Sequence, residues 1–295
     1  CLSVCLSVVV EVFLRHLNCY YTVCLSVCLS VCLSVCLSVC LSVCLSVSLS
    51  VCLSVCLSVL MTACLSVCLS AVHTEAEPFI IDDIAYDNES ERNADPCTSS
   101  SCMWATSADG NVYVPYVIAS HYASRERSII ERGLKSFGDV SCIRFVERSH
   151  QRDYLNIQSD NGCYSYVGRR GYSQTVSLDR QGCLYHSTVQ HELLHALGFN
   201  HEQCRSDRDQ HIRILWENIQ SGWAYAFDKI NTLNLNTPYD YNSVMQYHRY
   251  AFSGNNKPTM VPIPNANVEF GTANQMSRND ISRLNKLYNI KIDKN

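Results

Sequence analysis

The stretch that most constrains this chain is residues 191–201, which read HELLHALGFNH. The residues around it have the pattern of a helix, with Ser187 as a candidate N-cap. His191 and His195 are four positions apart, so on a helix they project from one face about one turn apart. Gly198 can take the left-handed conformation that ends a helix, which would bring His201 back toward the other two rings. The spacing therefore predicts three imidazoles around one point.

Three imidazoles arranged in this way suit a Zn²⁺ ion, with Zn–N distances of roughly 2.0–2.1 Å. Three protein ligands leave one position for water, which is typical of a catalytic rather than a structural zinc. Glu192 follows a ligand directly and cannot easily join it on the metal, but it can reach that water as a general base. The alternative is that these are ordinary helix histidines. The H-E-x-x-H pattern and its longer form are motifs of zinc proteases, so we expect a peptide-bond hydrolase.

Length and charge limit what else the chain can be. The sequence has 295 residues, is 47% hydrophobic and carries a formal net charge of −4. This length suffices for one sizeable domain with an appendage. The lack of a basic excess argues against a nucleic-acid partner. We expect a monomer.

Residues 1–72 hold thirteen of the 19 cysteines and are dominated by a tandem Cys-Leu-Ser-Val repeat. A period of four residues matches neither a helix face nor a strand face, so we expect neither a cysteine-rich array nor a membrane segment. The tetranucleotide TGTC, repeated and read in frame, encodes the same four residues. We therefore interpret this stretch as disordered or as an artefact of a translated DNA repeat.

The composition changes at residues 73–92, which we interpret as the remnant of a propeptide. Apolar residues there flank two acids, Asp82 and Asp83. The acids form a solvated turn, or else one carboxylate occupies the open zinc site before activation. Residues 93–295 are then the peptidase domain.

Apolar spacing predicts the architecture of that domain. Residues 120–137 carry apolar side chains at helical spacing, and Gly138 closes the pattern. Strands are expected at four places: residues 143–146, 154–157, 163–167 and 174–178. Residues 212–230, which follow the motif, are expected to form loop and helix. The prediction is a twisted sheet backed by two long helices, the second of which carries the histidines.

The longer string at residues 191–209, HELLHALGFNHEQCRSDRD, resembles the astacin family of zinc endopeptidases. The family signature is H-E-x-x-H-x-x-G-F-x-H-E-x-x-R-x-D-R-D, and every specified position matches. The resemblance covers about residues 79–288, and residues 93–97 and 110–116 resemble the six-cysteine fish hatching enzymes, or choriolysins, within that family. It implies an α+β fold of the zincin/metzincin type. Its N-terminal subdomain would hold a twisted, mostly parallel five-stranded sheet and two long helices, and its smaller, irregular C-terminal subdomain a helix near the end.

The resemblance also implies a zymogen. Asp83 aligns with the propeptide Asp that occupies the zinc in the family, while Asp82 stands where the family has Gly. Cleavage near Arg92 would leave Asn93 as the mature N-terminus. In the family this terminus is linked to the acid after the third histidine, which is Glu202 here, and a buried carboxylate needs such a partner.

Residues 243–247, SVMQY, resemble the Met-turn of the metzincins. Met245 would form an apolar floor beneath the three imidazoles, although core packing alone also accounts for a methionine. Tyr247 would be an extra zinc ligand at rest and would hydrogen-bond the oxyanion during catalysis. Gln246 replaces the usual His, and its similar size predicts little cost. The strand at residues 163–166 would be the sheet edge that pairs with extended substrate.

Six cysteines follow residue 92 and match an oxidised, secreted protein. The resemblance implies two disulfides, Cys97–Cys102 and Cys163–Cys183. The family partner of Cys142 would lie near the C-terminus, where this sequence has no Cys, and Cys204 is extra. A Cys142–Cys204 bond is one alternative, but we expect two free thiols.

These features predict a secreted, extracellular zinc endopeptidase with one Zn²⁺ and a protein substrate. The hatching-enzyme resemblance implies digestion of egg-envelope glycoproteins and storage in secretory granules. One alternative is a digestive or general extracellular astacin protease. Another, of a different class, is an inactive secreted binding module on the same fold. Intact Glu192 and three intact histidines argue against that second alternative.

Overall fold

A computed structural model describes residues 78–87 and 102–289. These residues belong to one compact unit, which begins at Pro78. The repeat at residues 1–72 lies outside the described residues, as do Arg92 and Asn93.

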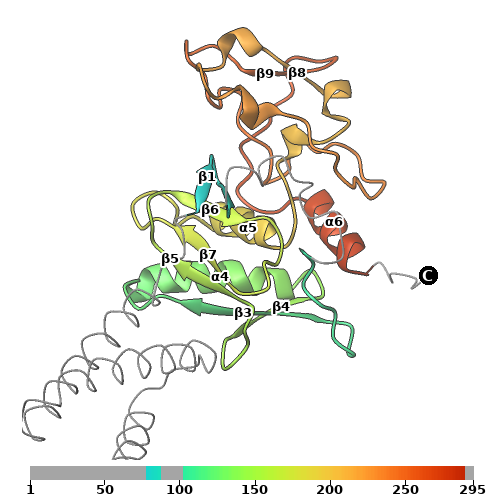
Figure 1. The fold of residues 1–295 in the computed structure, drawn as a ribbon. Coiled ribbons are helices and arrows are strands. Elements are labelled where there is room, and N and C mark those ends of the chain that lie inside the picture. Colours follow the sequence, from blue (N-terminus) through green and yellow to red (C-terminus); the bar gives the residue numbers. More distant parts are fainter. Residues whose placement is uncertain (1–77, 88–101, 290–295) are drawn as a thin grey trace, which may run out of the picture. The chain divides into compact units, whose positions relative to one another are not determined.

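A seven-stranded sheet organises the first part of this unit (Figure 1). Its strands lie in the order β1-β2-β6-β7-β5-β3-β4. Their bounds are β1 Phe79–Ile81, β2 Ile84–Tyr86, β3 Val112–Ile118, β4 Ile143–Glu147, β5 Tyr154–Gln158, β6 Cys163–Tyr166 and β7 Ser173–Leu178. All four strands expected after residue 140 are present, and each of their ends lies within one residue of the expected end.

The five strands β3 to β7 pair mostly in parallel. β3 pairs in parallel with β4 and with β5, and β5 pairs in parallel with β7, while β6 runs antiparallel to β7. The expected α+β fold with a mostly parallel five-stranded sheet is confirmed. The hairpin β1–β2 adds two strands, since β2 pairs in parallel with the outer edge of β6. This hairpin therefore covers the edge that the family resemblance assigns to substrate.

Two long helices cover the sheet's buried side chains. Helix α4 (Ser124–Gly138) begins four residues later than expected, because the side chain of Glu126 accepts the backbone N–H of Ala123 at 2.7 Å and caps the helix there. Helix α5 (His186–Ala196) packs against α4. The helices approach closely at Gly133, where an added Cβ would lie 2.3 Å from the Val189 side chain. Apolar side chains of both helices and of the sheet form one core.

The ends of α5 differ in how well the sequence predicts them. The N-cap is Tyr185, not Ser187, and no side chain caps it, so the expectation for Ser187 is wrong. At the other end, Gly198 has the positive φ of 102° that the motif predicts, and its N–H bonds the carbonyl of His195 at 2.8 Å. Only glycine takes this conformation without a Cβ penalty. The chain turns there and leads into His201.

The second part of the unit is smaller and irregular, as expected (Figure 1). It contains short 3-10 turns and a two-stranded sheet, and it ends in one helix. The bounds are η3 Glu202–Cys204, η4 Arg208–Gln210, β8 Ile212–Ile214, η5 Trp216–Asn218, η6 Ala224–Phe227, β9 Met260–Pro262 and α6 Arg278–Asn289. The prediction of a helix within residues 212–230 is wrong. Residues 212–214 form β8, which pairs antiparallel with β9, and the remainder of this range forms 3-10 turns and loop. An aromatic-rich core of its own supports this part.

None of the helices within residues 78–87 and 102–289 is long and apolar enough to cross a membrane.

Candidate active site

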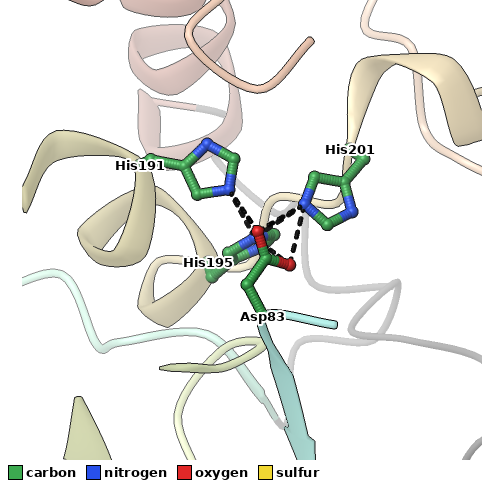
Figure 2. A group of neighbouring side chains, drawn as sticks. All are labelled: Asp83, His191, His195 and His201. Atoms are coloured by element: carbon green, nitrogen blue, oxygen red, sulfur yellow. Dashed lines mark hydrogen bonds and ion pairs between the residues drawn. The ribbon is translucent and has the colours of Figure 1, made fainter. Parts of the chain in front are cut away.

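The three histidines of the motif converge on one point (Figure 2). His191 and His195 project from α5, and His201 follows the turn at Gly198. Nε2 of His195 lies 3.1 Å from Nε2 of His191 and 3.2 Å from Nε2 of His201. His195 and His201 are buried, and the side chain of His191 is 14% exposed. The structure thus brings together the three residues that the spacing predicts.

The second nitrogen of two of these rings sets the tautomer. Nδ1 of His191 donates to the carbonyl of Val244 at 2.8 Å, and Nδ1 of His195 donates to the carbonyl of Phe199 at 2.7 Å. With the hydrogen on Nδ1, the lone pairs of Nε2 point into the cluster. Converging lone pairs repel each other unless a cation lies among them. A tetrahedral zinc site separates its nitrogens by about 3.3 Å, so this donor set fits zinc.

A carboxylate from the hairpin completes the cluster. Asp83 lies between β1 and β2, and Figure 2 shows it reaching from the hairpin toward the three rings. Its oxygens lie 3.0 Å from Nε2 of His191 and 3.0 Å from Nε2 of His201. Asp82 beside it has a positive φ of 60°. Aspartate tolerates this conformation better than most residues, which explains how it serves at the position of the family's Gly.

Burial and charge shift the pKa values in the cluster. Burial lowers the pKa of His195 to about 4 and also lowers that of His201. Burial also acts to lower the pKa of His191, but the hydrogen bond and the charge of Asp83 outweigh burial, so the pKa of His191 is raised. Burial and the neighbouring Asp83 carboxylate raise the pKa of Asp82 to about 9. His195 and His201 are therefore neutral near pH 7, which is the form that binds metal.

Glu192 lies beside the cluster and is 1% exposed. Its Oε2 has no hydrogen-bond partner among the described residues. Burial raises its pKa well above the usual value, and the charges of Asp83 and Asp82 add to the shift. A buried carboxylate oxygen without a partner is rare in folded proteins and points to a ligand that would satisfy it. A water or substrate amide at the cluster would meet that need.

Residues 243–247 pass close to the histidines. The Tyr247 ring packs against His201 with 4.3 Å between ring centroids, and the Tyr247 backbone N–H donates to Gln203 Oε1 at 3.2 Å. Met245 is 1% exposed and belongs to the main core with the apolar side chains of α5. Gln246 donates to the Tyr247 carbonyl at 3.0 Å and accepts from the Tyr239 hydroxyl. Its polar atoms are therefore satisfied where the family has His.

Comparison with known proteins decides the family. The model of the astacin family of peptidases matches residues 101–289. This chain is a member of the astacin family. High choriolytic enzyme 1 of the medaka Oryzias latipes is 52% identical over 199 residues, which cover 67% of this chain and 74% of the relative. Low choriolytic enzyme of the same fish is 49% identical over 199 residues, covering 67% and 73%.

A solved structure supports the same assignment. The structure of medaka high choriolytic enzyme 1, described as a hatching-enzyme zinc protease, matches with a TM-score of 0.64 at 52% identity. The match covers 67% of this chain and 99% of the other. This chain is therefore an astacin zinc metalloendopeptidase with the metzincin fold. Its cofactor is one zinc ion, and its substrates are proteins.

Glu202 of this astacin is buried in a network of charges. Arg283 from α6 donates to its two oxygens at 2.6 and 3.2 Å, Arg205 approaches at 3.5 Å, and the Asp240 N–H donates at 2.7 Å. Burial raises the pKa of Glu202, and the two guanidinium groups oppose that rise. Glu202 thus already has cationic partners, while its expected link to Asn93 lies outside the described residues.

Two positioning groups at this site were not predicted from the sequence. Asp280 of α6 accepts from the Ser243 hydroxyl at 2.6 Å and the Val244 N–H at 2.9 Å, and Val244 in turn accepts from His191. Arg283, one turn further on, holds Glu202. Nothing in the local sequence of α6 distinguishes these residues from surface charges. Their burial, 2% and 6% exposed, is the only signal, and it exists only in the folded chain.

The cysteines of the described residues fall into two kinds. Cys163 and Cys183 form a disulfide that ties β6 to the start of α5, with Cα atoms 5.7 Å apart. Closing a loop of this length stabilises the fold by about 3 kcal/mol in the chain-entropy model. Cys142 and Cys204 are free thiols, so the alternative Cys142–Cys204 bond is absent.

The remaining predicted disulfide concerns the N-terminal loop. Cys102 is disulfide-bonded, and Cys97 lies outside the described residues. The Cys97–Cys102 pairing therefore stays a prediction.

Proposed function

We propose that this astacin is a secreted hatching enzyme that digests egg-envelope glycoproteins. The identity of 49–52% with medaka choriolytic enzymes carries the proposal, because their names state an action on the chorion. The Cys163–Cys183 disulfide supports an oxidising, extracellular location. The enzyme acts as a monomer, free of the membrane, and is stored in secretory granules before release.

Each residue of the site has a role in the proposed mechanism. His191, His195 and His201 hold the zinc, which when bound polarises water and the scissile carbonyl. Glu192 accepts a proton from the attacking water with its unpartnered oxygen and returns it to the leaving nitrogen. Tyr247, packed beside His201, donates its hydroxyl hydrogen to the carbonyl oxygen as negative charge develops there. Met245 supports the rings from the core side.

The hairpin keeps the uncleaved chain inactive. Its Asp83 carboxylate contacts all three imidazoles, at 3.0 to 3.6 Å, where substrate would have to bind. Its strand β2 pairs with β6 and covers the edge that extended substrate requires. Cleavage near Arg92 releases the segment that holds both contacts. The hairpin therefore acts as a propeptide, and Asn93 becomes the new N-terminus that joins Glu202.

Removing only the carboxylate tests this inhibitory role. Asp83→Ala in the uncleaved chain should raise the peptidase activity of that chain several-fold, because the carboxylate no longer blocks the metal site. Activity should stay below that of the cleaved enzyme, since β2 still covers β6. Uncleaved chain is assayed on a quenched peptide, with intact mass confirmed by mass spectrometry. Asp109→Ala, an exposed acid elsewhere, is the control. No difference between the two variants would refute the inhibitory role of Asp83.

Activation and metal removal test the proposed function as a whole. Limited trypsin treatment should convert the chain to an enzyme that degrades fish egg-envelope protein faster than casein. A chelator such as 1,10-phenanthroline should abolish both activities, and one equivalent of zinc should restore them. Equal rates on the two substrates would contradict the hatching role. Activity that survives zinc removal would contradict the zinc mechanism itself.

A further inference from the structure

A second carboxylate of the hairpin contacts the domain away from the zinc site. Asp87 directly follows β2, four residues beyond Asp83. It forms an ion pair with the Arg170 guanidinium. Both of its oxygens also lie 2.8 Å from the Tyr172 hydroxyl, which donates to them. The side chains of Arg170 and Asp87 are 25% and 34% exposed, so the pair is partly shielded from water.

Contacts within the domain itself hold the loop that carries Arg170 and Tyr172. Both lie on the loop between β6 and β7, whose strands pair with each other. The Arg170 N–H donates to Oε1 of buried Gln174 at 2.9 Å, and Nε2 of Gln174 donates to the Gly168 carbonyl at 2.8 Å. The Gly168 N–H donates to the carbonyl of His195 at 2.8 Å. None of these three bonds involves the hairpin, so its departure does not remove them.

The loop also lies where a substrate strand would pass. Strand β2 occupies the β6 edge with Ile84 opposite Ser165 and Ala85 opposite Tyr166. An extended substrate on the same edge would follow the same line. Residues four apart on a strand point to the same face and lie about 13 Å apart. A substrate residue about four positions from the one at the zinc would therefore reach the place that Asp87 holds.

We propose that Arg170 and Tyr172 form a subsite of the processed enzyme that binds an acidic side chain of the substrate. A guanidinium beside a hydroxyl donor is a good receptor for an Asp or Glu carboxylate, because both hydrogen bonds are charge-assisted. Asp87 occupies this subsite in the uncleaved chain, as Asp83 occupies the zinc site. The inference rests on the proposed function, in which the hairpin leaves and substrate pairs with β6. It adds a determinant of cleavage preference.

Paired peptides measure the preference directly. The trypsin-activated enzyme is assayed on quenched fluorogenic peptides with one cleavage site, carrying Glu or Gln at three to five positions on either side of it. The wild type should cleave the Glu peptide on the order of five- to tenfold faster in kcat/KM at one of these positions, as expected for a partly shielded ion pair. Arg170→Gln should reduce this ratio to about one, chiefly by lowering kcat/KM for the Glu peptide.

Further variants separate recognition from folding. Arg170→Glu should reverse the preference, so that a Lys peptide is cleaved faster than the Glu peptide. Tyr172→Phe, which removes only the hydroxyl, should lower the ratio partway, and it decides the matter if the Arg170 variants fail to fold. Arg213→Gln, an exposed cation on β8, should keep the wild-type ratio.

Each result has one reading. The subsite is overturned if the wild type cleaves the Glu and Gln peptides at equal rates at every position. It is also overturned if the preference for Glu survives both Arg170→Gln and Tyr172→Phe. In that case Asp87 serves only to hold the hairpin. If the activated wild type cleaves none of the peptides and no protein, the proposed function fails instead.

Discussion

Replacing Glu192 with Gln lowers kcat for peptide hydrolysis by roughly 10²–10⁴-fold, the usual contribution of a general base. Glutamine keeps the size of the side chain but cannot accept a proton from water. Glu192 is 1% exposed, and its Oε2 has no protein partner among the described residues, so the neutral amide costs the fold little. The donor set of His191, His195 and His201 is untouched. Zinc content should therefore stay at one ion per chain.

The measurement combines steady-state kinetics of the activated enzyme with elemental analysis of the same sample. Glu147→Gln, at the exposed end of β4, is the control and should retain wild-type kcat. A Glu192→Gln enzyme that binds zinc fully and keeps more than a tenth of the wild-type kcat would rule out Glu192 as the general base.

Replacing Glu202 with Gln destabilises the fold by about 3–5 kcal/mol, because it leaves buried cations without their counter-charge. The side chains of Arg283 and Arg205 are 8% and 4% exposed, and both contact the Glu202 carboxylate. Glutamine has the right shape but cannot neutralise them. The loss should appear as a lower urea midpoint of unfolding at an unchanged m-value.

The control for this experiment is Glu217→Gln. Glu217 lies exposed on η5 in the same part of the chain, and its replacement should change the unfolding free energy by no more than about 0.5 kcal/mol. If Glu202→Gln behaved like this control, the network around Glu202 would not contribute to stability. Because Glu202 directly follows His201, we also expect the variant to bind zinc more weakly.

How far the sequence predicts the site depends on the range of each interaction. The positions of His191 and His195 follow from helical periodicity, and that of His201 follows from the turn at Gly198. These are local rules that act within eleven residues. The order of strands in the sheet was harder to predict from the sequence, because β3 pairs with β5 and β5 with β7, which differs from the order along the chain. Residues 212–230 show the limit, because β8 forms only by pairing with β9, some fifty residues later.

Asp83 illustrates both what the sequence predicts and what only the fold decides. The resemblance to astacins aligned it with a zinc-binding Asp, but only the fold carries it across 108 residues to His191. The contact depends on β2 joining the edge of β6 and on the positive φ of Asp82.

The sequence by itself determined the family and predicted the metal donors and the general base, because each follows from a short string of residues whose geometry is local. Only the tertiary structure decided that Asp280 orients Val244, the residue whose carbonyl accepts from His191. It also decided that Arg283 neutralises Glu202 and that Arg170 pairs with Asp87. These charges look like ordinary surface residues in the sequence. They acquire a role because folding buries each of them next to a partner that is distant along the chain. Burial then sets the strength of each interaction, and the fold decides which residue is the partner.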